Sequence, residues 1–530
     1  MKRSISAVLG LTLRVLPIGI AALAAQTEAV RADETLRISV ASVDGEDLDP
    51  MKFKSAGQHT FYPLVFDPLI AKDPSTGELA PGLATSWTVS DDGTTWTIEV
   101  RDGVTFHDGS PLTAEDVKFS LDRYTGAFGT VSAPGSERLA GLISDIKVID
   151  EDTLEITTPD GAPSLPFDMA PEAGSASAYV VPKAYVERVG DEEFNKAPIG
   201  TGPFRFKSQE TGRSMTFETY PDYWGQAADY DSLQLRIVPD LSARTAQLRS
   251  GDADIVAGIV GPAIPMMKAD DAVDLIAADS GHLVYMVIGG ITNPDSPLHD
   301  SDVRKAISLA IDRQAIVDGL LFGEGSPATF MSFPFSFGFP KDTGGMTAEF
   351  DAAKAADLLE TAGYAEGFEL TLFAATEGRD FAQAISQYLG EVGIKVDLQV
   401  REISQVLAEM RSDEGKSRTR LALVFGATGS GARADVGGLL YTYLNPGESY
   451  AQPYEDPDFS DMIKAQSVET DPDARGKMLA DILQHNFEEN YIMPLYYANA
   501  LFAVGGRVKS WSPIPGVGYP SNLNQAVLAD

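Results

Sequence analysis

The chain has 530 residues, more than one hydrophobic core usually organises, so we expect two or more lobes. Its 77 acidic and 41 basic residues give a formal net charge of −36, which argues against nucleic acid or anionic lipid as a partner because both require a basic surface. The absence of cysteine excludes disulfides, thiolate metal sites and cysteine nucleophiles.

Residues 1–32 have the pattern of a secretory signal peptide. Lys2 and Arg3 supply its positive end, residues 15–25 its short apolar run, and residues 30–32 the small side chains that a signal peptidase reads. No later stretch reaches the roughly 18 apolar residues that span a bilayer. Because no cysteine is available for lipid attachment, we expect a protein that is free in a periplasm and is not a lipoprotein.

The first elements are predicted from the spacing of apolar residues. Residues 36–40 alternate between apolar and polar and predict a strand, and residues 59–70 predict a helix. Two further alternating runs, 87–89 and 96–100, flank Asp92-Gly93. This dipeptide is typical of a tight hairpin turn, because glycine tolerates the positive φ that such a turn needs.

Helices and strands alternate in the remainder of the chain. Thr113 is expected to begin a helix, since its side chain can cap free N–H groups and acidic residues follow it. Residues 301–311 place apolar side chains at helical spacing, and residues 381–392 form one apolar helix face before an alternating strand at 394–400. This succession is typical of an α/β lobe. Residues 325–349 are rich in Gly, Pro and Phe without a period and predict a long ordered loop.

One long stretch resembles a known protein family. It runs from Gly82 to Arg123 and reads GLATSWTVSDDGTTWTIEVRDGVTFHDGSPLTAEDVKFSLDR. This stretch closely resembles the recognition segment of the family-5 solute-binding proteins of bacterial ABC importers, which include dipeptide-, oligopeptide- and nickel-binding proteins. Three other segments of the chain resemble characteristic motifs, or landmarks, of that family: Leu48-Asp49-Pro50, Pro198–Phe204 and Tyr223-Trp224-Gly225.

The resemblance implies an α/β protein with the two-lobed periplasmic-binding-protein fold of type II. Lobe I would comprise residues 33–285, with an extra subdomain at about 46–185, and lobe II residues 286–494. Residues 495–530 would return to lobe I. Two crossing strands would join the lobes, and the ligand would lie in the cleft between them.

No group of residues has the pattern of a catalytic site. Gly415-Lys416-Ser417 lacks the upstream glycine of a phosphate-binding loop, because position 410 is Met. The histidines show no metal-binding spacing, and a structural role in a turn is the natural interpretation of His107. The histidines are His59, His107, His282, His299 and His485. We therefore expect a protein that is not an enzyme and that carries no cofactor or metal.

The segment Leu421–Tyr443 is the strongest candidate for one wall of the ligand cleft. A buried strand ending at Phe425 leads into a glycine-rich loop that begins at Gly426, at the strand end where α/β sheets bind ligands. The resemblance implies that peptide-binding relatives have an Asp in this loop, which binds the α-ammonium group of the peptide. In this chain Asp435 lies slightly after the position that matches this Asp. The alternative for Asp435 is a helix cap before Leu439.

Other candidate contacts are spread over both lobes. The resemblance places Arg379 where dipeptide-binding relatives have an arginine for the ligand carboxylate, and the alternative is a solvated arginine at a helix start. Gly174 and Ser175 offer backbone and hydroxyl donors to an anion or a sugar, with an ordinary loop as the alternative. Tyr62 could supply an aromatic wall or pack in the core.

The resemblance implies the periplasmic substrate-binding component of an ABC importer, which captures a peptide by lobe closure and delivers it to permease subunits in the inner membrane. A sugar, opine or sugar-phosphate-like solute is the alternative ligand, and a ligand sensor is the alternative role. A secreted hydrolase is disfavoured, because no nucleophile and base are paired. We expect a monomer that does not bind nucleic acid.

Overall fold

The computed structural model describes residues 34–43, 45–54, 56–73, 76, 78–126, 137–159, 161–170, 179–425, 435–443 and 456–529. The expected signal peptide, residues 1–32, lies outside these ranges. Within them, no helix combines the length and the hydropathy that a membrane span requires.

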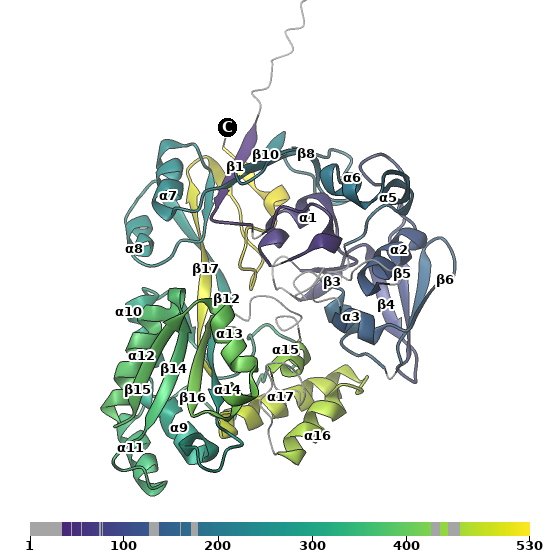
Figure 1. Ribbon diagram of the computed structural model, residues 1–530. Helices are drawn as coiled ribbons and strands as arrows, with labels where there is room; N and C mark the ends of the chain where they lie inside the picture. The colour runs from purple at the N-terminus through teal and green to yellow at the C-terminus, as the bar shows by residue number, and fades with distance from the viewer. Residues whose placement is uncertain are drawn as a thin grey trace, which may run out of the picture.

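The described strands build one mixed sheet that runs through the whole molecule (Figure 1). Eleven strands take part. In spatial order ten of them are β15 (Lys395–Arg401), β14 (Glu369–Ala375), β16 (Arg420–Phe425), β12 (Val273–Gly289), β17 (Ile492–Gly505), β11 (Ile255–Ala257), β1 (Thr35–Val40), β10 (Ser232–Ile237), β9 (Ser214–Thr219) and β8 (Phe204–Glu210). The eleventh, β13 (Gly325–Pro327), pairs with β17.

The long strands β12 and β17 join two separate hydrophobic cores. They pair antiparallel, and the register shifts between Ala278 and His282 of β12. On β12, Ile276 and Ala278 pack in one core, whereas Leu283 and the residues after it pack in the other. On β17 the change falls between Ala498 and Ala500. We call the half with the first core lobe I and the other lobe II, which confirms the predicted two-lobed α/β architecture. The predicted boundaries at 285 and 494 stay predictions.

Lobe I carries a subdomain with its own antiparallel sheet, on the right of Figure 1. Its strands lie in the order β4 (Ala84–Val89), β5 (Thr95–Val100), β7 (Thr153–Thr157) and β6 (Asp145–Val148). The predicted hairpin is confirmed, because β4 pairs with β5 and Gly93 has a φ of +74°. A small hairpin, β2 (Ile70–Lys72) with β3 (Leu79–Pro81), lies beside it.

The helices of lobe I cover both sheets. The predicted start at Thr113 is confirmed, because Asp116 Oδ2 accepts a hydrogen bond from the Thr113 N–H at 3.0 Å in a capping box. The predicted helix at 59–70 is wrong: a 3₁₀ turn at Ala56–Thr60 leads into one short helix, and Ile70 already begins β2. Lobe I contains α1 (Tyr62–Val65), α2 (Ala114–Thr125), α3 (Glu137–Leu142), α4 (Leu165–Asp168), α5 (Lys183–Val189), α6 (Asp191–Lys196), α7 (Leu241–Ser250) and α8 (Ala263–Lys268).

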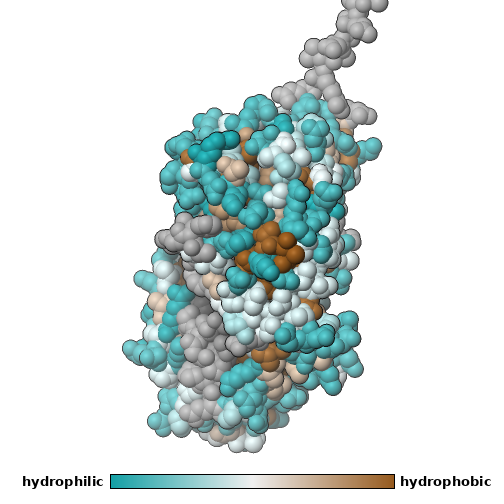
Figure 2. Space-filling view, turned by 90° about the vertical axis from the view of Figure 1, so that its right-hand side faces the viewer, coloured by the Kyte–Doolittle hydropathy of each residue, from teal (hydrophilic) through white to brown (hydrophobic). Residues whose placement is uncertain are grey.

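Lobe II is built from helices packed on β14, β15 and β16. The apolar face predicted at 381–392 and the strand after it are confirmed as α12 and β15. Its helices are α9 (Ser301–Ala310), α10 (Arg313–Leu320), α11 (Ala352–Thr361), α12 (Arg379–Glu391), α13 (Ile403–Arg411), α14 (Asp413–Ser417), α15 (Val436–Tyr443), α16 (Pro457–Gln466) and α17 (Pro472–Glu489). The face that Figure 2 shows is largely hydrophilic, as expected for so acidic a chain.

Candidate functional site

A cavity of about 900 Å³ lies between the two lobes. On the lobe I side it is lined by Thr76, Glu78, Leu79 and Phe167. On the lobe II side it is lined by residues 334–341 and by the first two turns of α17. Cavities of this size enclose small molecules and short peptides. Because both lobes contribute walls, opening or closing the lobes changes this cavity directly.

Four phenylalanines contribute to the walls of the cavity. Phe335, Phe337 and Phe339 come from the long loop of lobe II, and the ring of Phe167 in lobe I lies 5.3 Å from the ring of Phe337, centroid to centroid. Polar groups lie among them, including Glu78 of lobe I and two lysines of lobe II, Lys341 and Lys477. Such a site suits a solute with apolar faces and charged or polar ends. The sequence did carry a signal, since phenylalanines alternate from 333 to 339 as on one side of an extended chain.

Asp435 does not line this cavity, but it supports the wall. Its side chain is buried, and Arg475 donates to both carboxylate oxygens, at 2.6 Å and 3.1 Å. The backbone N–H of Gly437 donates to Asp435 Oδ1 at 2.5 Å, so the helix-cap interpretation holds for α15. The Arg475 guanidinium also lies 5.5 Å from the centroid of the Phe337 ring. The ion pair therefore holds the aromatic loop against α17.

The other predicted residues are dispersed. Tyr62 is buried in lobe I, where its hydroxyl is 3.0 Å from the carbonyl oxygen of Asp47 and accepts from Gln58 Nε2 at 2.9 Å. Arg379 is exposed at the start of α12. Phe425 ends β16 opposite Val284 of β12. Gly174, Ser175 and Gly426 lie outside the described residues. Contact of these residues with a ligand stays a prediction.

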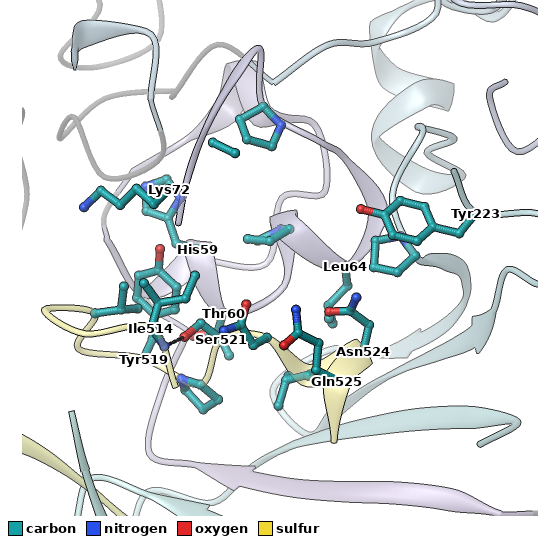
Figure 3. A pocket seen from close by; sticks show the side chains of 18 residues that line it. His59, Thr60, Leu64, Lys72, Tyr223, Ile514, Tyr519, Ser521, Asn524 and Gln525 are labelled. Carbon is teal, nitrogen blue, oxygen red and sulfur yellow. Dashed lines mark hydrogen bonds between the residues drawn. The ribbon is translucent and has the colours of Figure 1, made fainter. Parts of the chain in front are cut away.

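A second cavity, of about 240 Å³, lies within lobe I. Figure 3 shows His59 and Lys72 on one side of it and Tyr223 on the other. The ring of His59 is stacked on Tyr519, 5.7 Å between centroids, and its Nδ1 is 3.1 Å from the Tyr179 hydroxyl. The C-terminal segment 514–525 closes it from below in this view. Its walls come from segments far apart in the chain, namely residues 59–72, Pro203, Tyr223 and residues 514–525.

The family landmarks in the sequence meet inside lobe I rather than at the cleft. The buried carboxylate of Asp67 accepts hydrogen bonds from Thr201 Oγ1 at 2.9 Å, from the Tyr223 hydroxyl at 2.9 Å and from Trp224 Nε1 at 2.7 Å. Burial raises the pKa of Asp67, and these donors oppose that rise. Asp67 thereby joins the landmark around 198–204 to the landmark around 223–225.

His107 joins the Gly82–Arg123 stretch to the landmark around 198–204. Its Nε2 is 2.9 Å from the Gly202 carbonyl oxygen, and its Nδ1 accepts from the Gly200 N–H at 3.2 Å. Burial lowers the pKa of His107 to about 4, so the imidazole is neutral at physiological pH. The predicted structural role of His107 in a turn agrees with these contacts.

A second buried ion pair joins Arg123, the last residue of the Gly82–Arg123 stretch, to Asp49 of the Leu48-Asp49-Pro50 landmark. Arg123 Nη2 lies 2.7 Å from Asp49 Oδ2, and both side chains are buried. Arg123 also contacts Asp191 at 2.9 Å. Burial raises the pKa of Asp49 against the opposing effect of Arg123. These landmarks therefore specify the packing of lobe I. Within the described part of the chain, no cluster of three or more His, Asp or Glu side chains could hold a metal ion.

Comparison with known proteins agrees with this architecture. Residues 78–481 match the family described as bacterial extracellular solute-binding proteins, family 5 Middle. The dipeptide-binding protein of Escherichia coli (strain K12) is 30% identical over 386 residues, 68% of this chain and 69% of that protein. Heme-binding protein A of Haemophilus influenzae is 24% identical over 477 residues, 85% of each chain. The solved structure of HbpA2 from Haemophilus parasuis has a TM-score of 0.81 at 24% identity and covers 94% of this chain and 100% of that one.

Proposed function

The chain belongs to the bacterial extracellular solute-binding proteins of family 5, and on that basis we propose that it captures a peptide in its interlobe cavity. It is the solute-binding component of an ABC importer, in a family of binding proteins rather than enzymes. The observation that carries the peptide proposal is a cavity of about 900 Å³ with walls from both lobes, in a chain 30% identical to a dipeptide-binding protein.

Capture follows from a difference in affinity between two states. A solute that touches the aromatic loop of lobe II and Phe167 of lobe I makes both sets of contacts only when the lobes are closed. The closed state therefore binds it more tightly, and binding shifts the population toward closure. Permease subunits in the membrane would then receive the solute from the closed form.

The setting of the protein is part of the proposal. Residues 1–32 act as a cleaved signal peptide, and the mature chain works as a monomer in the periplasm without a lipid anchor. It has no enzymatic activity and no nucleic-acid partner. The net charge of −36 supports the last point, because a nucleic acid would be repelled.

A second ligand class, a sugar, opine or sugar-phosphate-like solute, is favoured by one observation. The carboxylate of Asp435 is bound by Arg475 and by the Gly437 N–H rather than being open to a ligand ammonium group. A solute without a free α-amine would not need that carboxylate. A sensor role, in which a receptor reads the closed form, would use the same cavity.

The ligand class is tested on the secreted protein. Native mass spectrometry identifies any co-purifying solute, and thermal shifts are then measured with di- and tripeptides, their N-acetylated forms, sugars and opines. A bound solute raises the melting temperature by mass action. If only free peptides raise the melting temperature, the peptide proposal is supported. If only sugars or opines raise it, the ligand belongs to the second class. If no small solute raised the melting temperature, the binding proposal would be wrong.

A further inference from the structure

The tip of the β4–β5 hairpin in lobe I touches lobe II. The contact is made by Gly93 at the turn and Thr470 in the segment between α16 and α17. A Cβ atom added at Gly93 would lie 2.5 Å from Thr470 Cγ2 and 3.8 Å from Thr470 Cβ. The methyl group of Thr470 therefore occupies the space that a side chain at position 93 would need. In Figure 1, α16 and α17 lie below the subdomain that carries this hairpin.

The hairpin tip is held in one conformation. The Asp92 carboxylate accepts from the Ser90 hydroxyl at 2.6 Å, the Thr94 N–H at 3.1 Å and the Thr94 hydroxyl at 2.9 Å. These hydrogen bonds lower the pKa of Asp92, so the carboxylate that organises the turn stays charged. These hydrogen bonds therefore fix the turn, and Gly93 brings no side chain to the contact with Thr470.

The lobe II side of the contact is tied to the cavity wall. Thr470 directly precedes Asp471, which caps α17 by accepting from the Ala474 N–H at 2.8 Å. The next residue, Pro472, begins α17 and lines the interlobe cavity. A force at the hairpin tip is thereby transmitted to the helix that forms the wall.

We propose that the hairpin tip at Gly93 is a latch that docks on Thr470 when the lobes close. The inference rests on the function proposed above and adds a device to it: the lobes meet at the latch as well as at the Phe167–Phe337 ring contact. With threonine at position 470, a Cβ atom at position 93 would strike the Thr470 methyl group, so glycine allows the lobes to close fully.

The latch can be trapped chemically, because the chain contains no cysteine. In the double variant Gly93→Cys/Thr470→Cys, the two Cβ atoms would be 3.8 Å apart in the docked state, within the range of about 3.5–4.5 Å for disulfides. The matched control is Gly103→Cys/Thr470→Cys. Gly103 has the same φ of +74°, and a Cβ added there meets nothing within 4 Å. Both variants thus carry equal backbone strain.

The experiment uses solute-free protein, so its outcome does not depend on the ligand class. Under a mild oxidant we expect the Gly93 pair to form a disulfide about tenfold faster or more than the control pair, since proximity controls the exchange step. Small-angle X-ray scattering should then give a smaller radius of gyration for the oxidised than for the reduced protein. Equal melting temperatures of the two reduced variants show that both are folded.

Two results would overturn the latch. One is a folded Gly93 pair that cross-links no faster than the control, which means that the tip does not reach Thr470. The other is rapid cross-linking without a change in the radius of gyration, which means that the contact is permanent. Neither result bears on the peptide proposal, which is decided separately by the thermal shifts.

Discussion

At the scale of single residues, sequence reasoning identified polar side chains but not their partners. Asp435 was predicted either to bind the ligand or to cap a helix, and nothing local to it indicates that Arg475 would bind its carboxylate. Asp67 was not singled out from the sequence, and its donors lie far away in the chain, at 201, 223 and 224. Such long-range pairs are decided by the packing of whole elements, so a sequence pattern cannot predict them.

His107 makes the stability of lobe I depend on pH. Its pKa in the folded protein is about 4, below its ordinary value of 6.5, because burial disfavours the charged ring. Between these values the unfolded chain binds the extra proton and the folded protein does not, so stability falls as the pH falls from 6.5 toward 4. The loss attributable to His107 should reach roughly 3 kcal/mol at the low end.

This dependence is measured by urea unfolding between about pH 4 and 7.5. Wild type should lose stability more steeply than His107→Gln below pH 6.5, because glutamine keeps a donor and an acceptor but does not titrate. Parallel curves for the two proteins over this window would contradict the assignment.

At the scale of elements, the sequence predicted those whose pattern is regular. The Asp92-Gly93 hairpin, the start of α2 at Thr113 and the α12–β15 pair followed from turn chemistry, capping and periodicity. The predicted helix at 59–70 does not continue to Ile70, because the chain becomes extended before Pro68, which pairs with Tyr179. Residues 325–349 were predicted as a loop, but Gly325–Pro327 form the strand β13. The pattern of the remaining loop does not predict its aromatic wall, because that depends on where lobe II places the loop.

The turn before β8 depends on glycines that pack against α1. A Cβ added at Gly200 would lie 2.1 Å from the carbonyl oxygen of Val65, which is backbone and cannot move aside. Gly200→Ala should therefore destabilise the protein by about 1–3 kcal/mol or more, as overpacked sites do. The measurement is the denaturation midpoint in urea.

Gly141→Ala is the matched control for this substitution. Gly141 is exposed in α3, and a Cβ added there meets nothing within 4 Å. Alanine should stabilise that helix by about 0.5–1 kcal/mol. A shift of both midpoints in the same direction would mean that the contact of Gly200 with Val65 is not the cause.

At the scale of the whole molecule, the resemblance of one stretch sufficed to predict the family and its two lobes, but not the cavity. The landmarks that carry the resemblance pack inside lobe I around Asp67, His107 and Asp49. These landmarks therefore identify the scaffold of the protein. The sequence-based reasoning did not assign the residues that line the cavity to a site. They are Thr76, Glu78, Leu79, Phe167, residues 334–341, Pro472, Asp473, Gly476, Lys477 and Ala480.

The acidity of the chain has a consequence for its stability. If every one of the 41 basic residues paired with an acidic one, 36 of the 77 carboxylates would still repel each other. Salt screens such repulsion, so the melting temperature should rise between about 0.01 M and 0.3 M NaCl at neutral pH. KCl at equal ionic strength should give the same rise. A fall with both salts would mean that the ion pairs outweigh the repulsion.

The continuous sheet has a mechanical consequence. Since β12 and β17 belong to one sheet that ends at β15 in one lobe and β8 in the other, a small bend near Ala278 and His282 swings both outer edges through a larger arc. The sheet thus acts as two rigid arms joined by a hinge, which lies where β12 and β17 pass from one hydrophobic core to the other. Binding of a solute in the cavity therefore changes the relative orientation of the outer surfaces of the two lobes, although these surfaces never touch the solute. A membrane partner that binds both lobes could distinguish the solute-bound from the solute-free protein without contacting the solute.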